Sequence, residues 1–325
     1  MKSLSSALKP ERLVRAARRL GLMPGGKPLK IAISANCQGT PLGQLITTMC
    51  DGVEISHITI VHKARDDASA EDLAAFKAAD IILAQKVADN YPCEYVRTNA
   101  LRERFGDKVL SWVNLYFSGY NPELTYMRGD DRTPMNGPLG DYHLRPVITA
   151  YQDGLSVEDA LARLRDPDYN ATHYSGAAKA SMDELHRRDE DTNIKIADFV
   201  ERRLPIAKQF HTFNHPSLDL LTELAARCAH AMGRDVSRRP SPGMLPEPLG
   251  MIMAPINPQA RLEMGFPEDF DPVTYKGTPL DWSQPRPTRQ PGHALYSMTE
   301  VIEAFYRRYD IDREAVLAFE AHPES

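Results

Sequence analysis

The chain has 325 residues, of which 42% are hydrophobic and 26% are charged, and its formal net charge at pH 7 is -5. These values are ordinary for a globular protein of one or two domains, and the net negative charge argues against nucleic acid as the main partner. No run approaches the roughly eighteen consecutive apolar residues that a membrane-spanning helix needs. We therefore expect a cytoplasmic protein without a transmembrane segment.

The N-terminal region predicts a basic helix over residues 8–22, ended by Pro24, Gly25 and Gly26. Its narrow apolar stripe favours packing on the body of the protein, with weak contact to an anionic membrane surface as the alternative. Basic and acidic residues interrupt its apolar positions, which is not typical of a secretory signal.

Strand and helix patterns then alternate along the chain. We expect strands over 29–35, 53–62, 80–85 and 108–114, and helices over 41–50, 70–79 and 94–105. This alternation is typical of a parallel sheet with crossover helices, which makes the fold class α/β.

The second half of the chain is predicted to be mainly helical. A Tyr-, Gly- and Pro-rich loop over 115–145 precedes helices over 146–152, 156–165, 176–188 and 192–203, and the charged run 186–191 indicates a solvated face or turn. Residues 240–291 are rich in proline and predict a segment that wraps the surface. Ser297 and Glu300 match a capping box that begins a last helix. We expect a basic helix over 1–28, an α/β catalytic domain with a helical insertion over 29–235, and a wrapping segment with C-terminal helices over 236–325 on that same domain.

Cys37 follows the first predicted strand in a polar turn, directly before a helix. Ligands of open α/β sheets bind at the carboxyl ends of the strands, and a helix start favours a thiolate or a bound anion. The alternative is a buried cysteine that acts as a small hydrophobe. The cysteines are Cys37, Cys50, Cys93 and Cys228, and without CxxC spacing they predict neither a zinc site nor disulfides. We expect no metal.

Polar side chains also end two other strands, at Gln85 and Asn114. These side-chain amides and the backbone amides of Gln38 and Gly39 are candidate donors to an oxyanion, and His143 in the following loop is a candidate substrate-binding residue.

His215 is the leading candidate for a catalytic base, His211 is the reserve, and His143 is a second reserve. Pro216 suits the first position of a helix, so we expect His215 at the helix N-cap, where the dipole keeps the imidazole neutral. The alternative is a plain capping role.

Several of these segments resemble the WcbI-type polysaccharide-biosynthesis proteins over roughly residues 29–232. The resemblance rests on residues 34–39 (Ser-Ala-Asn-Cys-Gln-Gly), the strand that ends at Gln85, residues 114–122, and residues 213–217 (Phe-Asn-His-Pro-Ser). It implies a Rossmann-like three-layer α/β fold with a parallel sheet, binding of coenzyme A or acetyl-CoA, and an acetyltransferase role on a capsular or other surface sugar. By this likeness Cys37 falls at the family's cysteine and His215 at its histidine.

A site for coenzyme A needs cations and backbone donors for its phosphates. The candidates are Thr40 at the helix start, Lys86, Arg128, Arg132 and Arg145.

The predicted function is therefore coenzyme-A-dependent acyl transfer to a sugar or polysaccharide precursor. Cys37 carries the acyl group with His215 as base, or His215 deprotonates the sugar hydroxyl while Cys37 shapes the site. Two alternatives stay open. One is a cysteine esterase or thioesterase similar to SGNH-type esterases, although Cys replaces their Ser and their late Asp-x-x-His signature is absent. The other is a non-catalytic ligand-binding component of polysaccharide biosynthesis.

Overall fold

The computed structural model describes residues 27–320 except 130–132, 241, 242, 244, 268, 272, 273 and 285. These residues form two compact units, unit 1 with residues 27–110 and 228–239, and unit 2 with residues 111–227 and 240–320. The boundary between the two units at residues 110 and 111 lies inside the segment 29–235, which we expect to be one domain. The helix predicted over 8–22 lies outside the described residues.

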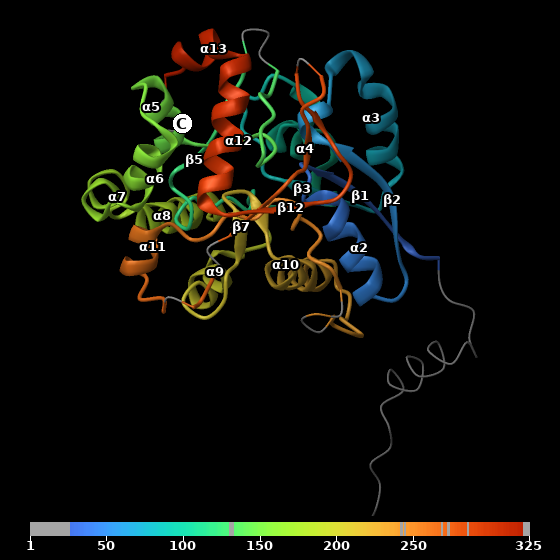
Figure 1. Ribbon diagram of the computed structural model, residues 1–325. Coiled ribbons are helices and arrows are strands. Elements are labelled where there is room, and N and C mark those ends of the chain that lie inside the picture. The colour runs from blue at the N-terminus through green and yellow to red at the C-terminus, as the bar shows by residue number, and fades with distance from the viewer. Residues whose placement is uncertain are drawn as a thin grey trace, which may run out of the picture. The chain divides into compact units, whose positions relative to one another are not determined.

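The predicted alternation of strands and helices is confirmed in the first part of the chain (Figure 1). The strands are β1 (Leu29–Ala35), β2 (Val53–Ile60), β3 (Ile81–Gln85) and β4 (Val109–Trp112), in the sheet order β2-β1-β3-β4. β1 pairs in parallel with both β2 and β3. The helices are α2 (Gly39–Met49), α3 (Ser69–Ala78) and α4 (Thr98–Phe105), and the helix predicted over 94–105 is split by a short 3-10 turn over Glu94–Val96.

The two faces of β1 are covered by different helices, because successive side chains of a strand point to opposite faces. Ala32 packs into one buried cluster with Phe76 of α3 and Leu101 of α4. On the other face, a Cβ atom built on Gly39 of α2 would lie 3.0 Å from the Cβ of Ala35. Glycine therefore lets α2 approach the strand closely. With α2 on one face of the sheet and α3 and α4 on the other, the arrangement is a three-layer α/β fold.

Unit 2 is mainly helical, as predicted. Its helices are α5 (Arg145–Gln152), α6 (Val157–Arg165), α7 (Pro167–Tyr174), α8 (Ala177–Asp189), α9 (Ala197–Arg203), α11 (Pro258–Glu263), α12 (Met298–Ile311) and α13 (Arg313–Leu317), while α10 (Leu218–Ala231) begins in unit 2 and ends in unit 1. Two-stranded antiparallel pairs join β5 (Leu124–Tyr126) with β6 (Tyr142–Leu144), β7 (Phe210–Thr212) with β8 (His215–Pro216), β9 (Tyr275–Gly277) with β12 (Ala294–Tyr296), and β10 (Leu280–Asp281) with β11 (Thr288–Arg289). The capping box of Ser297 and Glu300 is present at the start of α12.

The segment after residue 240 does more than wrap the surface. Tyr275, Phe305 and Tyr309 are buried in one core cluster with Val147 of α5 and Phe213. Because these side chains lose contact with water only when the C-terminal segment is in place, this segment is part of the core of unit 2.

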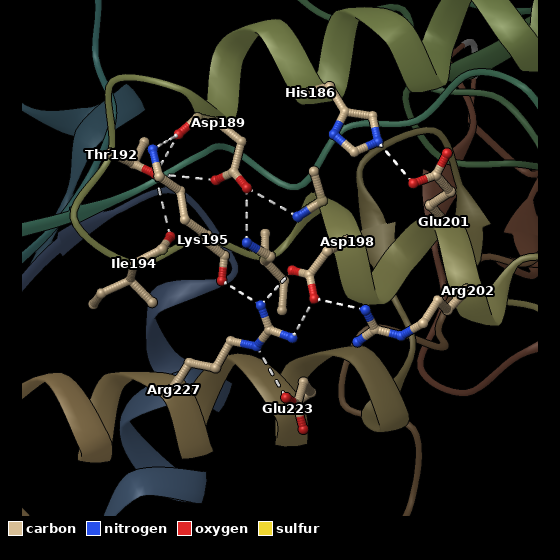
Figure 2. Close-up of polar contacts among 12 residues, drawn as sticks. His186, Asp189, Thr192, Ile194, Lys195, Asp198, Glu201, Arg202, Glu223 and Arg227 are labelled. Carbon is tan, nitrogen blue, oxygen red and sulfur yellow. Dashed lines mark hydrogen bonds and ion pairs between the residues drawn. The ribbon is translucent and has the colours of Figure 1, made fainter.

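A polar network fixes α8, α9 and α10 to one another in unit 2 (Figure 2). Asp189 is buried, and its Oδ2 accepts the N–H groups of Ile196 (2.8 Å) and Ala197 (2.9 Å) at the start of α9. Arg227 of α10 pairs with Asp198 of α9 at 2.5 Å. The charged run 186–191 is thus partly interior, which differs from the predicted solvated face.

Candidate active site

The turn after β1 is held by its own polar groups. The Asn36 N–H donates to Gln85 Oε1 (3.0 Å), and Asn36 Oδ1 accepts the Gln38 N–H (2.9 Å). The Gly39 N–H donates to the Asn36 carbonyl (3.0 Å). Asparagine favours such turns because its side chain bonds to the backbone two residues ahead. These bonds place Cys37 at the carboxyl end of β1, before α2.

Gln85 at the end of β3 braces this turn from the neighbouring strand. Its side chain is 4% exposed, and its Nε2 donates to Gln38 Oε1 at 2.9 Å. The amides of Gln38, Gly39 and Gln85 therefore already have acceptors within the turn, which differs from the oxyanion-binding role expected for them. Among the described residues, the N–H groups of Cys37 and Thr40 make no hydrogen bond to another residue.

The Cys37 side chain is half-buried and is not sealed inside the protein. Burial raises the pKa of the Cys37 thiol above its ordinary value. The thiol is therefore protonated at neutral pH in the free protein, which differs from the thiolate expected at a helix start. Nucleophilic attack by this sulfur needs a base that removes its proton.

Replacing Gln85 with Leu is expected to destabilise the protein by about 2 kcal/mol, because it removes two hydrogen bonds, the one that Gln85 Oε1 accepts from the Asn36 N–H and the buried one that Gln85 Nε2 donates to Gln38 Oε1. Chemical unfolding measures the loss. Alkylation of Cys37, followed by mass spectrometry, is expected to become faster because the turn loosens. Gln44→Leu is the matched control, since Gln44 is exposed on α2. Equal stability of the two variants would contradict the bracing role of Gln85.

In unit 2, His215 lies on β8 and not at a helix N-cap, so that prediction is wrong. Helix α10 begins later, at Leu218, whose N–H donates to the Glu247 carboxylate at 2.7 Å. Burial, followed by the nearby charge of His211, lowers the pKa of His215 to about 4. The imidazole is therefore neutral at pH 7, as expected, but burial and not a helix dipole is the cause. Its Nδ1 atom is buried without a hydrogen-bond partner among the described residues.

Tyr142 packs against His215, and Asn214 joins Tyr142 to a second tyrosine. The Tyr142 ring contacts it edge-on with ring centroids 5.5 Å apart, and the Tyr142 hydroxyl donates to Asn214 Oδ1. Asn214 Nδ2 donates to the hydroxyl of Tyr126, which is exposed. Neither tyrosine was among the predicted site residues, although the Tyr-rich composition of residues 115–145 was a signal.

His211, the reserve candidate, is paired with a carboxylate. Its Nε2 lies 3.0 Å from Glu247 Oε2. Glu247 lies in the proline-rich segment, where nothing in the sequence marked it as a partner. A histidine oriented by a carboxylate is a common element of acid–base sites, and Glu247 also holds the start of α10.

Asn114 follows β4 and belongs to unit 2. Its carbonyl accepts a hydrogen bond from Arg188 at 2.9 Å. Three residues later, the Phe117 N–H donates to the Phe213 carbonyl at 2.7 Å. The segment that begins at Asn114 therefore runs beside the β7–β8 hairpin that carries His215.

His143 is a core residue, and the expectation that it binds substrate from a loop is wrong. Its side chain is 0% exposed, with Nε2 2.6 Å from the Met135 carbonyl and Nδ1 3.0 Å from the Tyr309 hydroxyl. Burial lowers the pKa of His143 to about 4, so the ring is neutral in the core.

The predicted phosphate-binding cations belong to different parts of the chain. Lys86 directly follows Gln85 in unit 1, whereas Arg128 and Arg145 belong to unit 2. Arg128 is exposed, and Arg145 is half-buried at the start of α5. Arg132 lies outside the described residues.

Neither a metal site nor a membrane-spanning helix is found among the described residues. No group of three or more His, Cys, Asp or Glu side chains among them could hold a metal ion. None of their helices has the length and apolar character needed to cross a membrane.

Comparison with known proteins gives two matches. A family model described as polysaccharide biosynthesis enzyme WcbI matches residues 30–236. A solved structure matches with a TM-score of 0.64 and 20% sequence identity, over 90% of this chain and 100% of the other. It is described as WcbI, a novel polysaccharide biosynthesis enzyme, in its native form without a disulfide bond between coenzyme A and one of its cysteines. No curated protein matches the chain.

Proposed function

Since the chain belongs to the WcbI family of polysaccharide biosynthesis enzymes, we propose that it transfers an acyl group from a coenzyme A thioester to a hydroxyl group of a sugar or polysaccharide precursor. The observation that carries the proposal is the half-buried Cys37 thiol, held at the end of β1 by the turn that Gln85 braces. Such a placement suits a thiol that reacts with a ligand better than one that fills a core.

The residues around Cys37 fit a thiol-bearing anionic ligand. The N–H of Thr40 lies at the start of α2, and Lys86 follows the strand next to β1. A helix start and a lysine are both suited to phosphate groups. The solved structure is described as a native form without a disulfide bond between coenzyme A and a cysteine, and this mention of the two together supports assigning the coenzyme to the surroundings of Cys37. When bound, acyl-coenzyme A supplies the activated acyl group.

In the proposed covalent route, neutral His215 accepts the proton of the Cys37 thiol, and the sulfur attacks the acyl carbon. Coenzyme A leaves as a thiol after it takes up the proton, and Cys37 carries a thioester. A sugar hydroxyl then attacks this thioester, its proton passes to the Cys37 sulfur through His215, and the sugar ester is released. In the direct route, His215 deprotonates the sugar hydroxyl, which attacks acyl-coenzyme A while Cys37 only shapes the site.

Free coenzyme A is expected to raise the melting temperature of the protein, because a ligand that binds only the folded state stabilises it by mass action. The effect is about 2.7 kcal/mol at a concentration 100 times the Kd. A thermal-shift titration measures it, with adenosine at equal concentrations as the control without phosphates or thiol. The absence of a shift at millimolar coenzyme A would remove the proposal.

The products separate transfer from hydrolysis. Acyl transfer predicts that consumption of acetyl-CoA depends on an added sugar acceptor. Release of free acetate at a rate that the acceptor does not change would instead favour a thioesterase.

A further inference from the structure

A cavity lies wholly within unit 2. It has a volume of about 320 Å³ and is formed by residues near the starts of α5, α11 and α12, by α6 and α7, and by β9. Prolines and aliphatic side chains make up much of its lining, and the polar lining residues are Glu123, Asn170, Asn257, Arg261 and Tyr275. The candidate residues for acyl transfer do not line it.

Glu123 is the feature that marks this cavity as a binding site. Its side chain is 5% exposed, and its Oε2 atom has no hydrogen-bond partner among the described residues. The nearby Lys208 is already paired with Asp271 at 2.9 Å and donates to the Ala254 carbonyl. A buried oxygen without a partner is costly, and Glu123 is one of the residues that line the cavity, so its carboxyl group points to a donor on a ligand.

The amide side chains of the cavity are fixed before any ligand binds. Asn257 Oδ1 accepts the Gln259 N–H (2.9 Å) at the start of α11, and its Nδ2 donates to Asn170 Oδ1 (3.1 Å). Asn170 Nδ2 in turn donates to the Leu164 carbonyl at 2.9 Å. The polar wall is therefore rigid, which lowers the entropic cost of binding.

The charges of the lining favour a neutral ligand. Glu123 in its ionised form disfavours an anion, and Arg261, which donates to the carbonyls of Pro267 and Asp271, disfavours a cation. Apolar walls, the Tyr275 ring and a few hydrogen-bonding groups together suit a compact molecule with several hydroxyl groups. The volume is near the lower end of the range of about 300–1,000 Å³ for ligand pockets, enough for a single ring.

We propose that this cavity binds one ring of a neutral sugar, with a sugar hydroxyl donating a hydrogen bond to Glu123 Oε2. Sugar binding in this cavity does not depend on whether the chain transfers acyl groups.

Saturation-transfer NMR on the full chain tests this, with D-glucose, D-galactose, D-mannose and N-acetyl-D-glucosamine as probes, and with butylamine and acetate as charged controls. We expect at least one sugar to bind and neither control to bind. Glu123→Leu, which removes the acceptor, should weaken sugar binding at least tenfold. Glu158→Leu is the matched control on an exposed glutamate of α6 and should leave the affinity unchanged.

Met298→Phe supplies an independent test, because it fills the cavity from the start of α12 and leaves the carboxyl group intact. It should also weaken sugar binding at least tenfold. Sugar affinity that survives this change overturns the proposal even if Glu123→Leu fails to fold. Binding of a charged control in place of the sugars, or no sugar binding by the unaltered protein, overturns it as well. Because none of these measurements contains coenzyme A, their failure is separate from a failure of the proposed acyl transfer.

Discussion

The free energy of unfolding of a Glu123→Gln variant, minus that of the unaltered protein, is expected to rise by about 3 kcal/mol between pH 4 and pH 9. Burial raises the pKa of Glu123 from 4.5 to about 7 in the folded protein. Folding therefore takes up a proton between pH 4.5 and pH 7, and the unaltered protein loses stability as the pH rises through this window. Glutamine does not titrate, so the variant escapes this loss.

Urea unfolding of both proteins at a series of pH values measures the difference. His143 and His215 titrate in both proteins, so their contributions cancel in the comparison. Glu158→Gln changes an exposed carboxylate and should follow the unaltered protein at every pH. A constant difference between Glu123→Gln and the unaltered protein from pH 4 to pH 9 would mean that Glu123 titrates as an exposed acid.

We expect coenzyme A disulfide to form a mixed disulfide with the Cys37 sulfur and to release one coenzyme A, and we expect Cys37→Ser to abolish this adduct. Cys50, Cys93 and Cys228 are buried, so Cys37 is the accessible thiol among the four cysteines. Intact-mass measurement before and after addition of a reductant detects the adduct. In the covalent route the same variant should lose acyl-transfer activity by about 10³-fold or more, because the nucleophile and its base act as a unit.

Cys93→Ser is the matched control for this experiment. Cys93 is buried, and burial together with Asp66 raises the pKa of its thiol to about 11. The control should keep both the adduct and the activity. An acetyl group that remains on Cys37 after incubation with acetyl-CoA supports the covalent route, whereas full activity of Cys37→Ser would assign the chemistry to the direct route.

The sheet and its helices could be predicted because their signals are local. The alternating residues of β2 and the apolar run of β3 each identify a strand without reference to the rest of the chain. The turn at Cys37 follows from the same logic, since Asn36 and Gly39 are turn-forming residues between a strand and a helix. The bracing role of Gln85 needed the register of two strands, which a single sequence does not contain.

The parts that could not be predicted depend on tertiary burial. Nothing near His143 in the sequence shows that Met135 and Tyr309 take up both of its nitrogens. The cavity at Glu123 is assembled from segments as distant as Leu164 and Met298, so its unpartnered carboxyl oxygen has no local signature.

Unit 1 is discontinuous along the chain, and this affects the order in which it can form. The Ser237 N–H and hydroxyl both bond to the Met49 carbonyl at the end of α2, so the piece that carries Cys37 is finished by residues almost two hundred positions downstream. During synthesis the sheet leaves the ribosome long before this last piece does. Unit 1 therefore cannot be completed until the whole intervening segment has been translated. Its completion depends on contacts between residues far apart in the sequence, and folding steps of that kind are intrinsically slow.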